Sequence, residues 1–424
     1  MRILVLGSGG REHALYLKLA ESQMVSEIYF APGNGGVPQE RCFALDIMDF
    51  EAVERLVLEK SIDLLVVGPE APLAGGIKDF FHNRHPGIKV FGPDGHSAKL
   101  EASKVFSWEF MDRKGIPTAK SAVGHNLEES LAILQEHSLP VVIKADGLAA
   151  GKGVSIHNDR ASAEAVLHDI FEKDLFGEAG SKVLFQEFME GKEASLFALC
   201  NGKDAIYLPT ACDYKRANDD GEGPNTGGMG SYSPGEILTA DHIDFIHTHI
   251  VQKVLDEFHY TGILYVGLMV HGDSVSVVEF NCRLGDPETQ CVLPRIETDL
   301  LPYLLWSCGA KSGVFKIKEQ GHYLLPSKPG YAMNVVLAAS GYPGSYEKSI
   351  PLPLPEKLPE GVHIVHAGTA QKDGSLVSTG GRILSVVGYD QKASGAREKV
   401  YSFIEELKKS LDFGRLHYRK DIGL

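Results

Sequence analysis

Two side chains with oxygen donors lie two residues apart in a segment that is typical of a β-strand, Ser274 to Arg283. Side chains alternate between the two faces of a strand, so Glu279, Asn281 and Arg283 are predicted to share one face. The other face, predicted to point toward the core, holds Val278, Phe280 and Cys282. Mg²⁺ prefers hard oxygen ligands and keeps waters or phosphates in its shell. We therefore predict that Glu279 and Asn281 bind a divalent metal ion, with Arg283 placed to neutralise a phosphoryl group.

A glycine loop in the middle of the chain, Gly147 to Gly153, offers a second chemistry. It differs from a P-loop by one residue of spacing and by Gly153, which stands where a hydroxyl residue is required. Lys144 ends the apolar segment before the loop, and Lys152 lies among the glycines. Both ammonium groups are predicted to reach a polyphosphate covered by the loop amides, so ATP is the expected ligand. The alternative is a flexible surface hairpin.

A third glycine turn, Gly7 to Gly10, follows the first apolar segment and invites a dinucleotide-binding interpretation. Glu12 stands where the third glycine of that fingerprint is required, and no acidic residue follows the second strand. Hydride transfer is therefore disfavoured. Small residues still let backbone N–H groups approach an anion, so a substrate phosphate is predicted to bind here, with a ligand-free turn as the alternative. The loops Pro32–Gly36 and Gly68–Glu70 also follow strands and are predicted to converge on the same edge.

The segment Gly223 to Tyr232 is too rich in glycine for a helix or strand, yet Asn225 and Thr226 offer hydrogen-bonding groups. It is predicted to be a binding loop or lid. Asp213, Lys215 and Arg216 lie just before it, and such a charged cluster is as often a solvated face as a site. The histidines and cysteines show no zinc spacing, and no G-x-S-x-G elbow supports a serine hydrolase.

The elements that must position these groups fall into three predicted domains. Strands at 28–31, 64–68 and 89–92 alternate with helices such as 50–60, which is typical of an open parallel α/β sheet over residues 1–100. A helix at 97–114 and antiparallel strands are predicted to form an α+β domain over residues 101–325, with a mobile lid at about 120–190. Those strands are predicted at 140–145, 182–188, 194–200, 264–270 and 274–281. A small α+β domain should span 326–424, with a proline-rich connector at 342–361.

Composition narrows the class of protein. The 424 residues are enough for several domains, and 43% apolar and 23% charged residues are ordinary for a globular chain. Lysine and arginine number 42 against 56 acidic residues, a net charge of −14, which disfavours nucleic acid and anionic membranes as partners. Six cysteines without a C-x-x-C pair, no signal-peptide core and no long apolar run predict a reduced cytoplasmic protein.

Six motifs in order resemble the phosphoribosylamine–glycine ligase (glycinamide ribonucleotide synthetase) family of the ATP-grasp superfamily. The motifs are Gly7–Ala14, Pro32–Asn34, Gly68–Glu70, Lys144–Gly153, Gly223–Pro234 and Glu279–Gln290. His366–Thr369 and Gly380–Arg382 extend the resemblance toward the C-terminus. Leu284 stands where the family commonly has phenylalanine, an apolar exchange that affects no catalytic group.

The resemblance implies that glycine is phosphorylated by ATP to a glycyl phosphate, which the amine of 5-phosphoribosylamine then attacks. It implies Mg²⁺ or Mn²⁺ as the metal, a reaction in purine biosynthesis, and no covalent protein nucleophile. The chain is expected to act as a monomer on small molecules. Since the chain ends at residue 424, the resemblance is to a form without fused downstream enzymes.

The resemblance also assigns residues to roles. For ATP the implied residues are Lys104, Lys144, Gly147, Gly151, Lys152 and Gly153 around the phosphates, Gln186, Glu187 and Met189 at the adenine, and Glu193 at the ribose. For the other substrates they are Gly9, Gly10, Asn34, Glu70, Asn225, Thr226 and Gly228. Asp213, Lys215 and Arg283 are the candidates for the reacting carboxylate and amine. The rival interpretations are another carboxylate–amine ligase, a nucleotide-sensing module without turnover, and the disfavoured dehydrogenase.

Overall fold

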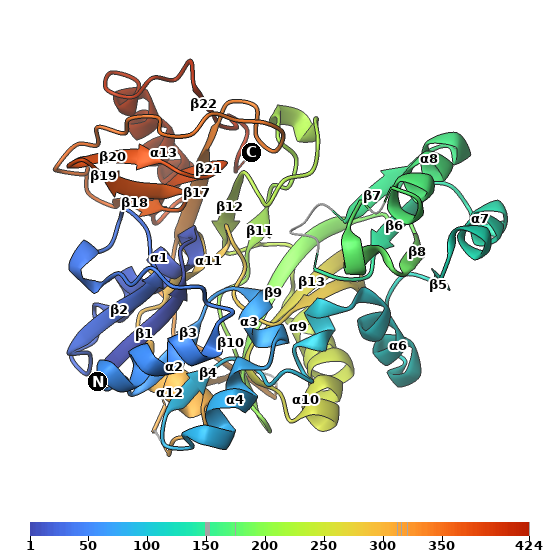
Figure 1. The fold of residues 1–424 in the computed structure, drawn as a ribbon, viewed down its shortest axis with the longest axis horizontal. Coiled ribbons are helices and arrows are strands. Elements are labelled where there is room, and N and C mark those ends of the chain that lie inside the picture. Colours follow the sequence, from blue (N-terminus) through green and yellow to red (C-terminus); the bar gives the residue numbers. More distant parts are fainter. Residues whose placement is uncertain (149–152, 174, 312, 315, 320, 424) are drawn as a thin grey trace.

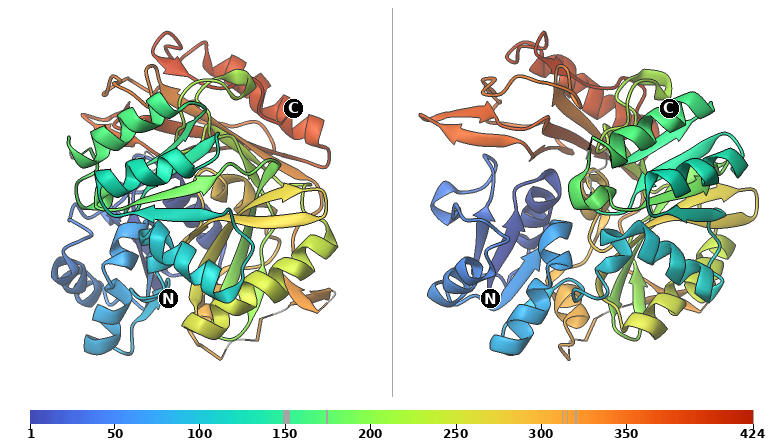
Figure 2. Two further views of the ribbon diagram at one scale, coloured as in Figure 1. Left: turned by 90° about the vertical axis from the view of Figure 1, so that its right-hand side faces the viewer. Right: turned by 45° about the vertical axis from the view of Figure 1, so that its right-hand side comes forward.

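The computed structural model of the chain describes residues 1–148, 153–173, 175–311, 313–314, 316–319 and 321–423. These residues form four sheets of four or more strands and one separate two-stranded hairpin. Figure 1 shows the N-terminal sheet at lower left, the C-terminal sheet above it, and a smaller unit that projects to the right. Figure 2 shows the same parts from two further sides.

The N-terminal sheet is parallel, with strand order β2-β1-β3-β4. Its strands are β1 (Arg2–Gly7), β2 (Glu27–Pro32), β3 (Leu64–Val67) and β4 (Lys89–Phe91). Its helices are α1 (Gly10–Leu19), α2 (Phe50–Glu59), α3 (Glu70–Ala74) and α4 (Ile77–Arg84). The apolar run at 3–6 is completely buried, as a parallel strand covered on both faces requires. The prediction of an open parallel α/β sheet is confirmed.

The projecting subdomain, residues 121–187, is antiparallel with strand order β5-β8-β6-β7. It contains β5 (Ser121–Gly124), α7 (Leu127–Glu136), β6 (Val141–Ala145), β7 (Val154–His157), α8 (Arg160–Phe171), a 3₁₀ turn at Gly177–Gly180 and β8 (Val183–Glu187). Its buried apolar side chains form a cluster separate from those of the rest of the chain. The subdomain therefore has its own small core.

The central sheet has the order β14-β13-β9-β10-β16-β15. Its long members β9 (Lys192–Asn201), β13 (Thr261–His271) and β14 (Ser274–Asn281) pair antiparallel, which confirms the prediction, whereas β10 and β16 are parallel. Its short members are β10 (Ala205–Tyr207), β15 (Ile317–Glu319) and β16 (His322–Leu324). The accompanying helices are α5 (Lys99–Ala102), α6 (Lys104–Lys114), α9 (Ala240–Ile246), α10 (Gln252–Phe258), α11 (Thr289–Val292) and α12 (Leu301–Ser307), with a π-helical turn at His247–Val251.

The helix predicted at 97–114 is wrong in one respect, because it is broken at Ser103. This residue has extended backbone angles, φ −133° and ψ 115°, and its hydroxyl accepts a hydrogen bond from the Phe106 amide at 3.0 Å. Ser103 therefore caps α6, and the preceding turn forms the separate helix α5.

The C-terminal sheet reaches back into the middle of the chain, with the order β11-β12-β17-β21-β18. It contains β11 (Cys212–Asp213), β12 (Gly230–Ser233), β17 (Tyr331–Ala339), β18 (Val362–His366), β21 (Arg382–Asp390) and β22 (Leu416–His417), and it is accompanied by α13 (Ala393–Leu407) and the hairpin β19 (Thr369–Lys372) and β20 (Ser375–Ser378). Residues 340–361 form no helix or strand element, as predicted. The predicted domain limits at 100 and 325 stay a prediction.

Candidate active site

A cavity of about 1320 Å³ lies where the four sheets meet. Its walls come from the turn after β1, the inner side of the projecting subdomain, the loop 213–227, strand β14 and the start of β21. Strands β9 and β13 lie between the projecting subdomain and the N-terminal sheet in Figure 1, and β14 pairs with β13 in the same central sheet. Residues from distant parts of the sequence therefore share one space.

One end of the cavity carries two lysines and one carboxylate. The Lys144 ammonium donates to the Val278 carbonyl at 3.2 Å, and the Lys104 ammonium donates to the Gly147 carbonyl at 2.9 Å. Burial lowers the pKa of Lys104, and it lowers the pKa of Lys144 to about 8. Burial alone would raise the pKa of Glu279, but the positive charges of Lys215 and Lys144 outweigh it and hold that pKa below its usual range. Glu279 is therefore ionised beside two cations, which suits a metal–polyphosphate complex.

The pair Glu279 and Asn281 fits a divalent cation by donor type. The Asn281 amide donates to Glu279 Oε1 at 3.3 Å, which places the two side chains together on β14. Among the described residues, no group of three or more His, Cys, Asp or Glu side chains could enclose a metal ion. A cation on Glu279 and Asn281 would have to complete its shell with phosphates and waters, as Mg²⁺ commonly does.

The alternation predicted for this strand is interrupted by one residue. The register with β13 shifts between Gly267 and Leu268, opposite Val278. Because of this β-bulge, Val278 is only half-buried and lines the cavity, whereas Phe280 and Cys282 are buried as predicted. The prediction that Val278 lies on the core face is therefore wrong, and its carbonyl instead serves Lys144.

A second charged group combines Asp213, at the end of β11, and Lys215, just after it, with Glu193 of β9. Lys215 forms an ion pair with Glu193, which was predicted to bind the ribose of ATP. Burial raises the pKa of Asp213 to about 7, helped by the negative charges of Glu288 and Glu193 and opposed by Lys215. The negative charges of Asp213 and Glu193 raise the pKa of Lys215 despite its burial. The group therefore combines a fixed cation with a carboxyl that can exchange a proton near neutral pH.

Arg283 is held between two carboxylates from different parts of the chain. Its Nη2 lies 2.8 Å from Glu101 Oε1, and its Nε lies 3.4 Å from Glu70 Oε2. Glu101 also accepts a hydrogen bond from the Cys282 amide at 2.7 Å. Burial would lower the pKa of Arg283, but Glu101 and Glu70 raise it. Glu70, which was predicted to bind substrate, thus lines the cavity and forms an ion pair with Arg283.

The first glycine turn is filled by protein carboxylates. The Gly9 amide donates to Glu12 Oε2 at 2.6 Å, and the Arg11 amide donates to Asp286 Oδ2 at 3.2 Å. A Cβ atom at Gly68 would lie 2.1 Å from Glu12 Oε1, so a side chain at residue 68 would displace the Glu12 carboxylate. Glu12 therefore replaces the third glycine of the dinucleotide fingerprint with a carboxylate that caps helix α1. A phosphate at this turn has to share it with two negative groups.

The structure brings most of the predicted site residues to the cavity. Those that line it are Gly9, Glu70, Lys104, Lys144, Gly153, Gln186, Glu193, Asp213, Lys215, Asn225, Thr226, Glu279, Asn281 and Arg283. Those outside the lining are Gly10, Asn34, Gly147, Glu187, Met189 and Gly228. Gly151 and Lys152 lie outside the described residues, so their predicted roles stay predictions. The Asn34 amide donates to the carbonyls of Ser8 and His366, both at 2.9 Å, and links two sheets.

Several cavity residues were given no role from the sequence. They are Glu12, Glu101, Asp286, Glu288 and Arg382. Burial raises the pKa of Glu288, whose Oε1 accepts from the Ser195 hydroxyl at 3.4 Å. Asp286 and Glu288 lie in the polar turn after Arg283, which was a usable signal. The spacing of Glu12 from Gly9 is that of a capping box, which was a second signal.

Three family models match consecutive parts of the chain. They describe the phosphoribosylglycinamide synthetase N domain, over residues 1–101, its ATP-grasp (A) domain, over 102–289, and its C domain, over 332–424. The chain belongs to the phosphoribosylglycinamide synthetase family. The family's three-domain architecture accounts for the N-terminal parallel sheet, the central ATP-grasp region and the C-terminal sheet.

Full-length relatives agree with this family. The chain is 42% identical over 432 residues to the phosphoribosylamine–glycine ligase of Leptospira interrogans, covering 100% of the chain and 98% of that protein. It is 40% identical over 437 residues to that of Pseudomonas aeruginosa, covering 100% and 97%. A crystal structure of phosphoribosylamine–glycine ligase from Thermotoga maritima has a TM-score of 0.83 at 35% identity, covering 100% of both chains.

More distant structures share the fold alone. The biotin carboxylase domain of the Hydrogenobacter thermophilus 2-oxoglutarate carboxylase has a TM-score of 0.71 at 16% identity, covering 98% of the chain and 91% of that domain. None of the helices in the described part of the chain combines the length and apolar composition needed to span a bilayer.

Proposed function

We infer that the chain is a phosphoribosylamine–glycine ligase of purine biosynthesis. It joins glycine to 5-phosphoribosylamine with ATP and releases glycinamide ribonucleotide, ADP and phosphate. The observation that supports this inference is one cavity lined both by Lys104, Lys144 and Glu279 and by the glycine turn of the N-terminal sheet. Relatives at about 40% identity over the whole chain share that name.

The ATP end has an apolar wall for a base and a charged floor for phosphates. Leu148, Ile156 and Phe188 line the cavity and keep 37%, 39% and 43% of their surface exposed, which is unusual for large apolar side chains inside a site. Gln186 lies beside them with its amide donating to the Ser121 hydroxyl at 3.0 Å. We propose that the adenine packs here and that the phosphates extend toward Lys144.

We propose Mg²⁺ or Mn²⁺ on Glu279 and Asn281. When bound, the ion would screen the phosphate charge and orient the γ-phosphoryl group. Lys104 and Lys144 supply positive charge at the same end, and their burial strengthens each contact. The negative charge that develops on a transferred phosphoryl group is therefore stabilised by groups already in position.

The carboxylate of glycine needs activation because its oxygen is a poor leaving group. Phosphorylation gives glycyl phosphate, which the phosphoribosylamine nitrogen attacks with release of phosphate. We propose that Arg283 and the pair Asp213 and Lys215 orient the carboxylate and the amines, since all three line the cavity. Positioning of the two reactants supplies much of the rate in such a reaction.

Phosphate release is the direct test. The purified chain should release phosphate only when ATP, glycine and freshly made phosphoribosylamine are all present. Release with another amino acid in place of glycine would instead indicate a different carboxylate–amine ligase. ATP-dependent stabilisation with no release under any combination would indicate a nucleotide sensor.

We also propose that the protein acts as a monomer in the cytoplasm. All six cysteines are free thiols, and Cys200, Cys212, Cys282 and Cys291 are buried, which agrees with a reducing compartment. Light scattering during gel filtration measures the mass directly, and the expected value is that of one 46.1 kDa chain.

A further inference from the structure

The phosphate of phosphoribosylamine needs a positive partner that the first glycine turn does not provide. The Gly9 and Arg11 amides there already donate to the carboxylates of Glu12 and Asp286. Two negative charges at a helix N-terminus offset the favourable dipole that would otherwise attract a phosphate. The cation has to come from another element that reaches this end of the cavity.

We propose that Arg382, at the start of β21 in the C-terminal sheet, binds the phosphate of phosphoribosylamine. This inference rests on the proposed function. Arg382 lines the cavity with 22% of its side chain exposed. Its Nη1 lies 3.2 Å from Asp286 Oδ1, and the other oxygen of that carboxylate accepts from the Arg11 amide of helix α1. One carboxylate thus separates the guanidinium from the glycine turn.

The guanidinium is oriented by contacts that use only one of its nitrogens. Nη1 donates to the carbonyls of Gly227 at 2.6 Å and Asp286 at 2.8 Å. Among the described residues, Nε and Nη2 of Arg382 have no hydrogen-bond partner. These two nitrogens form one edge of the planar group, and that edge is the one that binds phosphate oxygens in a bidentate manner.

The other arginines of the cavity are less suited to this role. Arg11 and Arg283 are paired with the buried carboxylates of Glu12 and Glu101. Arg419 donates to both oxygens of Asp421, and Arg216 donates to the Gly223 carbonyl inside its own loop. Arg382 comes from the C-terminal sheet, and its carboxylate partner Asp286 also accepts from the Arg11 amide at the end of the glycine turn.

The carboxylate of Asp286 would repel a phosphate bound next to Arg382. The positive charges of Arg382 and Arg11 outweigh its burial and keep its pKa low, so it is ionised. Its two oxygens are occupied, however, by the Arg11 amide at 3.2 Å and by the Gln290 amide at 2.8 Å, as well as by Arg382. Asp286 therefore fixes the plane of the guanidinium and leaves the free edge turned away from the carboxylate.

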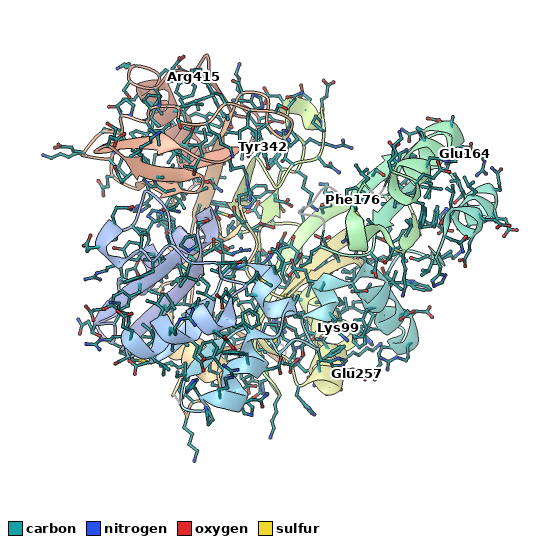
Figure 3. All side chains as sticks on the ribbon, in the orientation of Figure 1. Lys99, Glu164, Phe176, Glu257, Tyr342 and Arg415 are labelled. Carbon is teal, nitrogen blue, oxygen red and sulfur yellow. The ribbon has the colours of Figure 1, made fainter. Side chains whose placement is uncertain are left out.

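The alternative is that Arg382 only holds the loop 225–228 in place. Tyr342 contacts the same loop, so a Tyr342 variant distinguishes this structural role from phosphate binding. The Tyr342 hydroxyl accepts from the Gly227 amide at 3.1 Å, and Arg382 donates to the Gly227 carbonyl. Tyr342, just after β17, and Arg382, at the start of β21, therefore both hold the loop 225–228. Tyr342 lies toward the middle of the molecule, whereas Arg415 lies at its upper edge (Figure 3). Arg415 pairs with the exposed Glu347 and serves as the matched arginine control.

The experiment measures ribose 5-phosphate binding by calorimetry, with ribose as the control ligand, in wild type and in Arg382→Gln, Arg382→Lys, Tyr342→Phe and Arg415→Gln. Loss of a charge-assisted contact of about 1.5–3 kcal/mol should weaken ribose 5-phosphate binding by about 10- to 100-fold in Arg382→Gln. Arg382→Lys keeps the positive charge but loses the two parallel N–H donors of the guanidinium, so its affinity for ribose 5-phosphate should lie between those of wild type and Arg382→Gln. The KM for phosphoribosylamine should rise in parallel, with the KM values of ATP and glycine nearly unchanged.

Tyr342→Phe and Arg415→Gln should bind ribose 5-phosphate as wild type does. Unchanged binding in folded Arg382→Gln would overturn the proposal, as would equal rises in all three KM values for Arg382→Gln and Tyr342→Phe. If Arg382→Gln does not fold, Arg382→Lys with wild-type affinity and wild-type KM overturns it. Binding of ribose 5-phosphate is measured without turnover, so it can be judged independently of the reaction. If the wild-type protein released no phosphate, that result would count against the proposed function and not against the role of Arg382.

Discussion

The two ends of the cavity are built in different ways. At the ATP end, Glu279 and Asn281 lie on one strand, and Lys144 lies on a strand whose motif is continuous in the sequence. At the N-terminal end, Glu12 lies on helix α1, Asp286 in the turn after β14 and Arg382 at the start of β21. Asp286 accepts from the Arg11 amide and pairs with Arg382, while Glu12 accepts from the Gly9 amide. The residues of the ATP end can be predicted from local periodicity. The residues of the N-terminal end come together only when the sheets pack against one another. The comparison indicates that the charged groups of the ATP end are set by local sequence motifs. The charged groups of the N-terminal end are brought together by contacts between domains.

The largest effect is expected at the ATP end. Glu279→Gln removes the charge that faces Lys144 and that would hold the proposed divalent cation, so turnover should fall by about 100-fold or more. The dependence of the rate on Mg²⁺ concentration should weaken at the same time. Steady-state phosphate release at varied Mg²⁺ measures both.

The matched control is Asp273→Asn, which removes an exposed carboxylate from the turn before the same strand. Its rate should equal that of wild type. A wild-type rate in Glu279→Gln would remove the metal assignment and, with it, the contrast between the two ends.

At the N-terminal end the expected effect is on stability. Glu12→Gln leaves the buried guanidinium of Arg11 without its carboxylate, whose side chain is 3% exposed. Breaking a buried ion pair in this way should cost about 3 kcal/mol of unfolding free energy. Urea denaturation followed by circular dichroism measures the loss.

Glu21→Gln is the control, since Glu21 pairs with Lys18 just beyond the end of the same helix but is 62% exposed. It should leave the urea midpoint almost unchanged. Equal midpoints for the two variants would show that Glu12 contributes nothing specific at this turn.

The contact between the N-terminal and C-terminal sheets should respond to pH. The His13 ring bonds the Gly36 carbonyl through Nε2 and accepts from the His366 amide at Nδ1, both at 3.0 Å, which fixes the neutral form. Burial lowers the pKa of His13 to about 3 and that of His366 to about 4. Both unfolded values are near 6.5, so the stability is present above pH 6.5 and is lost as the pH falls below it.

Between pH 7 and pH 5 the loss should be about 2 kcal/mol for each histidine. Urea midpoints at the two pH values measure it. His366→Gln should reduce the pH dependence, whereas His82→Gln, an exposed position on α4, should leave it as in wild type. A slope that survives both His13→Gln and His366→Gln would assign the acid sensitivity to other groups.

The smallest effect is expected in the projecting subdomain, residues 121–187. If it closes over ATP, limited proteolysis within it should slow severalfold when ATP and Mg²⁺ are added. Glycine alone is the control and should have no effect. Cleavage that ATP leaves unchanged would argue against closure and would make this wall of the cavity a fixed one.

Part of the site was predictable because the relevant signals are local. The alternation from Ser274 onward placed Glu279, Asn281 and Arg283 at the cavity, and the apolar strand before Gly147 placed Lys144 there. The β-bulge at Val278 was not predictable in this way, since it depends on the register with β13. The role of Asn34 was not predictable for the same reason. Its side-chain amide donates to the carbonyls of Ser8 and His366, and His366 lies 332 residues further along the chain.

The sequence by itself determined the family, the parallel and antiparallel sheets, and most of the residues that line the cavity, because periodicity and spacing act over a few neighbouring residues. Only the tertiary structure decided which charges meet. Glu12 fills the first glycine turn, Glu101 and Glu70 hold Arg283, and Arg382 reaches the N-terminal end of the cavity. The energy of such pairs depends on separation and burial, and both are set by how distant segments pack.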